Sequence, residues 1–263
     1  MALNYKIPLL MTLFAGLSTV LGGFLTFFVK KTNIKALSVG LGFSAGVMIF
    51  LSFTQILKNS NLMLIKFFPN HSQWLVFLGF TLGIITALLI DYFIPDHIDE
   101  DLFCTQEHCV HQHRIKRAGL FTAIAISVHN FPEGMATFFV ATQNLTLGAS
   151  VALAIAIHNI PEGIAVALPI YHATGKKRTA IWYTFLSGIS EPIGAILGLF
   201  ALNYFLPQAA VGFLFAAVAG IMVYISFDTL LPLSREYGDG HYSVFGIMSG
   251  IFVIWISLLL LGM

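Results

Sequence analysis

His129-Asn130-Phe131-Pro132-Glu133-Gly134 recurs 29 residues later as His158-Asn159-Ile160-Pro161-Glu162-Gly163. Each copy lies in an apolar stretch long enough for a helix, and each places an imidazole and a carboxylate four residues apart on one helix face. Ionisable groups inside a membrane cost roughly 2.5–3.5 kcal/mol each, so they mark functional sites. Histidine, glutamate and asparagine are ligands for divalent metal ions. The repeated motif therefore predicts a metal-binding site within a membrane.

The composition also indicates a membrane protein. Of 263 residues, 57% are hydrophobic and only 10% charged, and the mean hydropathy is +0.87, whereas soluble domains are about 25% charged. A net charge of +1 gives no reason to expect a nucleic-acid partner. A membrane span needs about 20 apolar residues. We therefore predict an all-α integral membrane protein, a single transmembrane domain over 1–263, with eight spans: 7–29, 36–57, 73–94, 119–142, 147–171, 180–205, 209–232 and 243–262.

The basic residues predict an orientation in the cell membrane. Most of the 13 lysines and arginines follow the first, third, fifth and seventh spans. Cytoplasmic segments carry such an excess, so these segments are expected inside. Because the number of spans is even, the N- and C-termini are then both outside.

The longest polar segment, 95–118, is predicted to be a cytoplasmic, histidine-rich loop. Its candidate metal ligands are His108, Cys109, His111 and His113, which do not follow a fixed zinc-finger spacing. A reducing compartment would keep the thiol available. A polar linker without metal explains the same composition, and both interpretations stay open.

Each motif combines its ligands with a proline and a glycine. Proline lacks the backbone N–H, so it frees a carbonyl and is expected to break the helix at the motif. Glycine lets another backbone approach. The bland alternative for one copy is a hydrogen-bonded His–Glu pair without metal, but two copies in neighbouring spans favour a metal site.

A third carboxylate, Glu191, precedes Pro192 in the sixth span. Three carboxylates inside a membrane repel one another unless a cation or a proton lies between them. One dication would relieve this repulsion, as would two that share Glu133 and Glu162. The predicted ligands are His129, Asn130, Glu133, His158, Asn159, Glu162 and Glu191.

Weaker candidates lie on either side of the motifs. Met48, Ser52 and Gln55 of the second span are candidates for the ion path, although packing is the simpler explanation of Met48 and helix association explains Gln55 equally well. Asp228, near the inner end of the seventh span, is a candidate for an exit route. His172, past the fifth span, is expected to be solvated.

The paired motifs, Ser190-Glu191-Pro192 and the histidine-bearing segment before the fourth span resemble the ZIP metal transporters, in particular the bacterial zinc-uptake branch with a broad metal range. The resemblance implies uptake of Zn²⁺, and also of Fe²⁺, Mn²⁺ and Co²⁺, into the cytoplasm as cargo, with no cofactor. It implies that spans 1–3 and 6–8 form an inverted repeat around spans 4–5, and that the protein is a homodimer. It also implies a binuclear centre, with His129, Glu133, Glu162 and the nearby His158 at one ion and Asn130, Asn159 and Glu191 at the other.

Two functions of other classes compete with transport. An intramembrane zinc-dependent hydrolase would need an activated water at an open coordination position and a base. A membrane metal sensor would use the polar segment to detect the metal. The sequence contains no His-Glu-x-x-His motif. We therefore expect a transporter and not an enzyme.

Overall fold

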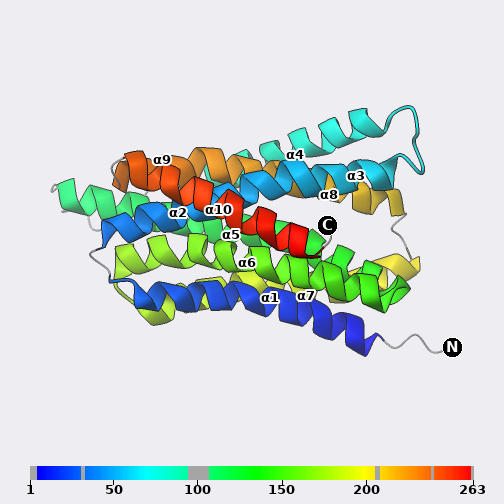
Figure 1. Cartoon of the computed structure of the whole chain (residues 1–263), viewed down its shortest axis with the longest axis horizontal. Coiled ribbons are helices and arrows are strands. Elements are labelled where there is room, and N and C mark those ends of the chain that lie inside the picture. The colour runs from blue at the N-terminus through cyan, green and yellow to red at the C-terminus, as the bar shows by residue number, and fades with distance from the viewer. Residues whose placement is uncertain (1–4, 31–32, 94–106, 205–207, 238–239, 262–263) are drawn as a thin grey trace.

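The computed structural model describes residues 5–30, 33–93, 107–204, 208–237 and 240–261, and this part of the chain contains helices and no strands. The helices lie side by side with their axes in one general direction (Figure 1). In chain order they are α1 (Lys6–Leu25) with the 3₁₀ turn η1 (Thr26–Phe28), α2 (Ile34–Leu51) with the π-helical turn η2 (Ser52–Ile56) and α3 (Leu57–Leu64), α4 (Ser72–Phe93), α5 (Glu107–Gln143), α6 (Leu145–Thr174), α7 (Lys177–Tyr204), α8 (Gln208–Ile225) with the π-helical turn η3 (Ser226–Leu230) and α9 (Leu231–Tyr237), and α10 (Gly240–Leu261).

The all-α membrane fold is confirmed. Within the described residues, seven helical segments are long and apolar enough to cross a membrane. The eighth long helix, α5, contains the first motif and many polar residues near its start, so its hydropathy is lower, and it packs against α6 and α7. Side chains that face away from the bundle are large and apolar, such as Trp74 on α4 and Phe245 on α10, which are 71% and 65% exposed. Lipid is the solvent that such a surface requires.

Two predicted local features need correction. Helix α5 begins at Glu107, so the predicted loop cannot extend to residue 118, and residues 94–106 lie outside the described part. Hydropathy locates the apolar part of a helix but not the polar turns that precede it. The predicted helix breaks are also absent, because α5 and α6 continue through Pro132 and Pro161. Neighbouring helices can support a proline within a membrane helix, so one lost hydrogen bond does not end it.

The helices form two groups that meet along their length. In the first group, α1, α5, α6 and α7 pack against one another, and this group carries both motifs. In the second group, α2 and α3 pack with α8, α9 and α10, and α4 packs on α8. The groups meet where α2 contacts α6 and where α5 contacts α8. The Oγ of Ser44 on α2 donates a 2.6 Å hydrogen bond to the Pro161 carbonyl on α6 across this boundary.

The second group contains an internal repeat. The π-helical turns η2 and η3 carry related sequences, Ser-Phe-Thr-Gln-Ile and Ser-Phe-Asp-Thr-Leu. The Oγ of Ser60 on α3 donates to the Gly212 carbonyl on α8, and the Oγ of Ser234 on α9 donates to the Ser38 carbonyl on α2, both at 2.7 Å. The Oγ of Ser38 in turn donates to the Ser234 carbonyl at 2.6 Å. Ser60 and Ser234 are separated by as many residues as Ser38 and Gly212, so the Ser60–Gly212 and Ser234–Ser38 bonds occupy equivalent positions in the two halves. This equivalence agrees with the inverted repeat that the family resemblance implies.

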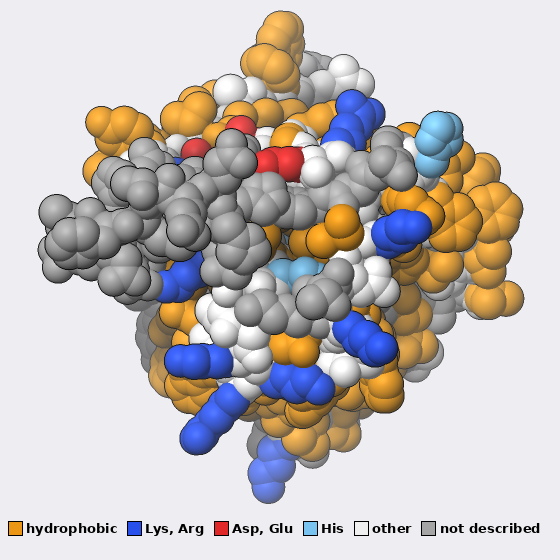
Figure 2. All heavy atoms as spheres, turned by 90° about the vertical axis from the view of Figure 1, so that its left-hand side faces the viewer, with side chains coloured by type: hydrophobic (Ala, Val, Ile, Leu, Met, Phe, Trp, Pro, Cys, Tyr) orange, Lys and Arg blue, Asp and Glu red, His pale blue; other side chains and the backbone are white. Residues whose placement is uncertain are grey.

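Basic side chains gather at one end of the molecule. Figure 2 shows this end, where α1 finishes and α2 begins, with lysine and arginine side chains around a hollow that has a histidine at its floor. The exposed basic residues here include Lys30, Lys35, Lys176 and Arg178. This is the end predicted to face the cytoplasm.

Candidate metal site

The structure brings all seven predicted ligands into the interior of the first group. The side chains of His129, Asn130 and Glu133 come from α5, and those of their counterparts come from α6. Glu191 comes from α7. None of the seven is more than 6% exposed, and His158 is the most exposed of them: His129, Asn130, Glu133, His158, Asn159, Glu162 and Glu191.

Each histidine pairs with the glutamate of the other motif. The Nε2 of His129 lies 3.0 Å from Oε1 of Glu162, and the Nε2 of His158 lies 3.3 Å from Oε2 of Glu133. The i, i+4 spacing placed His129 and Glu133 on one face of α5, but their partners come from α6. The two pairs therefore tie the motif helices together, and the carboxylate of each motif is matched with the imidazole of the other.

The two asparagines donate hydrogen bonds to backbone carbonyls on neighbouring helices. The Nδ2 of Asn159 donates to the Ala15 carbonyl on α1 at 2.9 Å, and it also donates to a carboxylate oxygen of Glu191. The Nδ2 of Asn130 donates to the Ser187 carbonyl on α7 at 3.3 Å. Because their N–H groups are used in this way, both side chains offer their carbonyl oxygens as acceptors at the site.

Unpaired buried polar atoms cluster at this site. An unsatisfied buried polar atom usually costs about 1–3 kcal/mol, so native proteins contain few. Among the residues that the structure describes, six such atoms belong to the predicted ligands and one neighbouring residue: Thr19 Oγ1, His129 Nδ1, Asn130 Oδ1, Asn159 Oδ1, Glu162 Oε2 and Glu191 Oε2. Nearly all are oxygen atoms that can accept, which is the arrangement a cation satisfies.

The described side chains are not arranged as a finished coordination sphere. No group of three or more histidine, cysteine, aspartate or glutamate side chains within the described ranges is placed to hold a metal ion. The imidazoles lie against the carboxylates instead. A dication that binds to the paired atoms would have to displace the two His–Glu pairs.

The close packing of this site depends on the motif glycines. A Cβ atom at Gly134 would collide with the Glu191 carbonyl on α7, and one at Gly163 would collide with the Thr19 carbonyl on α1. The predicted close approach of another backbone is confirmed at both positions. It brings α1 and α7 against the motif helices, where they supply Ala15 and Ser187 as hydrogen-bond acceptors.

The weaker candidates lie near the end of α2 and in η2. Met48 and Ser52 are fully buried, and the Ser52 hydroxyl donates to the Met48 carbonyl at 2.7 Å. Gln55 is partly buried and lines a small pocket with Thr54, Phe50 and residues of α10.

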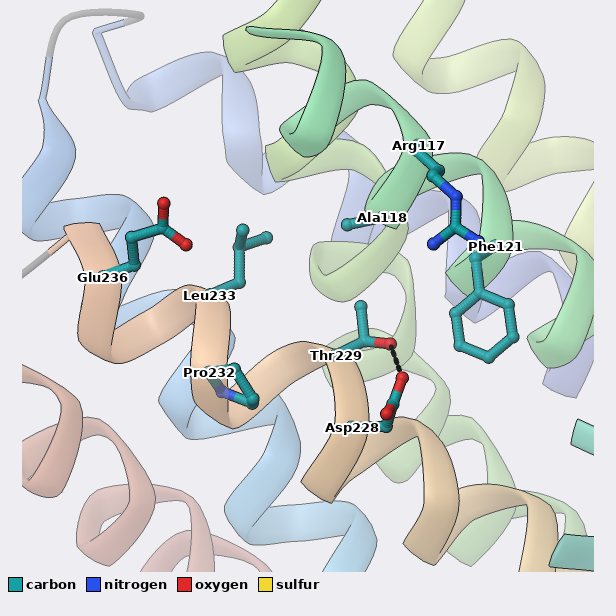
Figure 3. Close-up of a pocket in the computed structure, with 8 residues that line it drawn as sticks. All are labelled: Arg117, Ala118, Phe121, Asp228, Thr229, Pro232, Leu233 and Glu236. Carbon is teal, nitrogen blue, oxygen red and sulfur yellow. Dashed lines mark hydrogen bonds between the residues drawn. The ribbon is translucent and has the colours of Figure 1, made fainter. Parts of the chain in front are cut away.

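Asp228 lines a pocket towards the opposite, basic end of the molecule. Figure 3 shows this pocket between α5, which contributes Arg117, Ala118 and Phe121, and the segment from η3 to α9. The Thr229 hydroxyl donates to Asp228 at 3.4 Å. The Arg117 guanidinium forms a 3.1 Å ion pair with Asp91 on α4 and so connects the two groups of helices beside the pocket.

Of the histidines outside the motifs, His172 is buried. His172 was expected to be solvated, but it is only 7% exposed, and its Nδ1 lies 3.0 Å from the Leu168 carbonyl. That expectation was wrong because the end of α6 is covered by neighbouring helices. The four candidates His108, Cys109, His111 and His113 lie in the first turns of α5, and their side chains are outside the described part.

Sequence reasoning missed several contributors to the site. Ala15 and Ser187 act through backbone carbonyls, which no side-chain pattern reveals. Ser44 and Thr19 are ordinary residues of apolar helices by sequence. A comparison of the two halves of the chain would have helped, because Val47–Leu57 and Ile221–Leu231 share the pattern Met-x-x-x-Ser-Phe.

The chain is similar to known zinc transporters. Residues 95–258 match a family model described as ZIP Zinc transporter. A protein of Akkermansia muciniphila, named as the zinc transporter ZupT, is 46% identical, and the match covers 95% of this chain and 96% of the relative. Proteins with the same name from Campylobacter jejuni and Chlorobium phaeovibrioides are 46% and 48% identical, and each match covers 97% of both chains.

Proposed function

The chain belongs to the ZIP zinc transporter family, and we propose that it takes Zn²⁺ up across the cell membrane into the cytoplasm. Its relatives are named as zinc transporters, and they match this chain over nearly their whole length. The protein is a transporter and not an enzyme. The observation that carries the proposal is the cluster of unpaired acceptor atoms inside a membrane-spanning bundle. A visiting dication would satisfy these atoms, and they would otherwise destabilise the fold.

The ion would follow a path between the two groups of helices. We propose that it enters past Gln55, Ser52 and Met48 and displaces the His–Glu pairs at the motifs. Neutral imidazole nitrogens and carboxylate oxygens would then bind it, and Glu133 and Glu162 would bridge two ions. It would leave past Asp228 towards the basic end, with both termini on the other side of the membrane. Dimerisation of the protein is part of the same proposal.

The ligand set favours several transition metals. Nitrogen and carboxylate oxygen without thiolate suit Zn²⁺, Fe²⁺, Mn²⁺ and Co²⁺ and discriminate weakly among them. Mg²⁺ gives up its water reluctantly and Ca²⁺ needs more oxygen ligands, so both are expected to be poor substrates. Buried cysteine is not needed for this selectivity.

Uptake into proteoliposomes tests the function directly. Purified protein should move Zn²⁺ into sealed vesicles, and Fe²⁺, Mn²⁺ or Co²⁺ in excess should compete, whereas Mg²⁺ and Ca²⁺ should not. A hydrolase or a metal sensor predicts no flux. Vesicles that contain folded protein but accumulate no more Zn²⁺ than empty vesicles would refute transport.

Uptake is expected to weaken as the external pH falls below about 6.5, where an ordinary imidazole becomes protonated. Protonated His129 and His158 cannot bind a metal ion, and each would hold its carboxylate partner more strongly. Initial rates of zinc uptake at several external pH values measure this effect. An ionophore that carries zinc controls for vesicle leakage, and rates that stay constant down to about pH 5.5 would contradict the prediction.

Replacing Asp228 with asparagine is expected to slow zinc uptake several-fold at saturating zinc and to change the half-saturating concentration little. The reason is that Asp228 lies at the proposed exit, in a pocket that no motif residue lines, so its charge acts on release more than on capture. Thr54→Asn is the matched control, because Thr54 occupies the equivalent position of the other π-helical turn. An unchanged maximal rate in Asp228→Asn would remove this residue from the path.

A further inference from the structure

The metal site has two-fold symmetry in its backbone contacts. The bond from Asn130 on α5 to the Ser187 carbonyl on α7 matches the bond from Asn159 on α6 to the Ala15 carbonyl on α1. The glycine contacts repeat the relation, since Gly194 on α7 packs on the Phe131 carbonyl of α5 as Gly22 on α1 packs on the Ile160 carbonyl of α6. The symmetry therefore exchanges α5 with α6 and α1 with α7.

Under this symmetry Thr19 occupies the position of Glu191. Their backbone carbonyls are the ones on which Gly163 and Gly134 pack. Their side chains also start in equivalent directions, because a Cβ atom at Gly188 would lie 3.2 Å from the Cβ of Thr19, and one at Gly16 would lie 3.3 Å from the Cβ of Glu191.

The two halves of the site differ in chemistry. In what we name the Asn159 half, the Glu191 side chain reaches the Asn159 amide and pairs with it. In what we name the Asn130 half, the counterpart of Glu191 is Thr19, whose hydroxyl is attached directly to Cβ and reaches less far. Both Thr19 Oγ1 and Asn130 Oδ1 are buried and unpaired there.

An unpaired hydroxyl is unusual for a threonine in this helix. Buried hydroxyls in helices normally donate to a carbonyl three or four residues earlier. Thr12 and Ser18 of α1 and Thr26 of η1 do so, at 2.9, 2.6 and 2.7 Å respectively. Thr19 is fully buried and makes no such bond, so its oxygen remains available to a ligand.

We propose that Thr19 is an oxygen ligand of the transported ion, and that it binds the ion together with the Asn130 side-chain oxygen in the Asn130 half. This inference rests on the proposed function and adds a residue and a selectivity to it. Hydroxyl and amide oxygens are hard ligands that carry no charge, so this half should suit Mn²⁺ and Fe²⁺ relative to Zn²⁺. It should also hold an ion less firmly than the Asn159 half, which contains a carboxylate.

The test is Thr19→Val, which removes the hydroxyl and keeps the shape of the side chain. In proteoliposomes we expect the half-saturating concentration of Mn²⁺ to rise about 10-fold, in the range seen when metal sites lose a supporting group, and that of Zn²⁺ to rise less. Thr19→Ser, which restores a hydroxyl, should behave like the unchanged protein. Thr12→Val is the matched control on the same helix, because the Thr12 hydroxyl bonds within α1.

The ratio of Mn²⁺ to Zn²⁺ uptake separates a ligand from a packing residue, since a loss of folded protein lowers both rates equally. Thr19→Ala provides a second variant should the valine disturb folding, and it should show the same change in ratio. An unchanged ratio in both variants would refute the role of Thr19 while leaving zinc transport by the unchanged protein intact. Absence of flux in the unchanged protein would refute the proposed function itself.

Discussion

Zinc uptake is expected to fall at least about 100-fold when Glu133 is replaced by alanine, because an anionic group at the centre of the site is lost. Glu133 is nearly fully buried, and its Oε2 lies 3.3 Å from the Nε2 of His158. The substitution removes one carboxylate that could bind the dication and leaves the His158 imidazole without its partner. Radioactive zinc uptake by proteoliposomes measures the loss.

Two controls separate this effect from unfolding. Glu133→Gln keeps the size and a hydrogen-bonding group, so it should fold normally and still fail to transport, since the charge is missing. Ser127→Ala on the same helix should transport normally, because the Ser127 hydroxyl only donates to the Ala123 carbonyl of its own helix. A normal uptake rate in the two Glu133 variants would show that the site has been assigned to the wrong residues.

The second large effect is expected from Gly163→Ala, which should lower the thermal stability of the protein and abolish its metal binding. In an isolated helix this change stabilises by about 1 kcal/mol. Here the new Cβ would overlap the Thr19 carbonyl of α1, which is backbone and cannot rotate away. Overpacking of this kind usually costs 1–3 kcal/mol or more, so we expect the steric term to exceed the gain in helix propensity.

Thermal unfolding in detergent, followed with and without Zn²⁺, measures this prediction. The control is Gly198→Ala on α7, where the nearest atoms are 3.1 Å or more away and belong to Met135, whose flexible side chain can adjust. Gly198→Ala should therefore unfold at or above the temperature of the unchanged protein. Equal melting temperatures for Gly163→Ala and the unchanged protein would contradict the close packing of α1 on α6.

The family and the set of predicted ligands follow from short-range patterns in the sequence. The repeated motif, with its histidine and glutamate four residues apart, indicated the buried polar face of α5 and of α6. Glu191 was recognised from the same reasoning, because a carboxylate in an apolar stretch needs a compensating charge. Hydropathy gave the spans, but it placed the start of α5 too late, because the first turns of that helix are polar.

The partner of each ligand was decided by the tertiary structure. Sequence spacing shows which side chains share a helix face, but not which other helix that face meets. In the fold His129 therefore pairs with Glu162 across two helices, although Glu133 is the carboxylate on its own face. Likewise, nothing in the local sequence distinguishes Thr19 from the other hydroxyl residues of α1. Its relation to Glu191 arises from the two-fold packing of α1 and α7 around the motif helices, because contacts between distant segments exist only once the chain is folded.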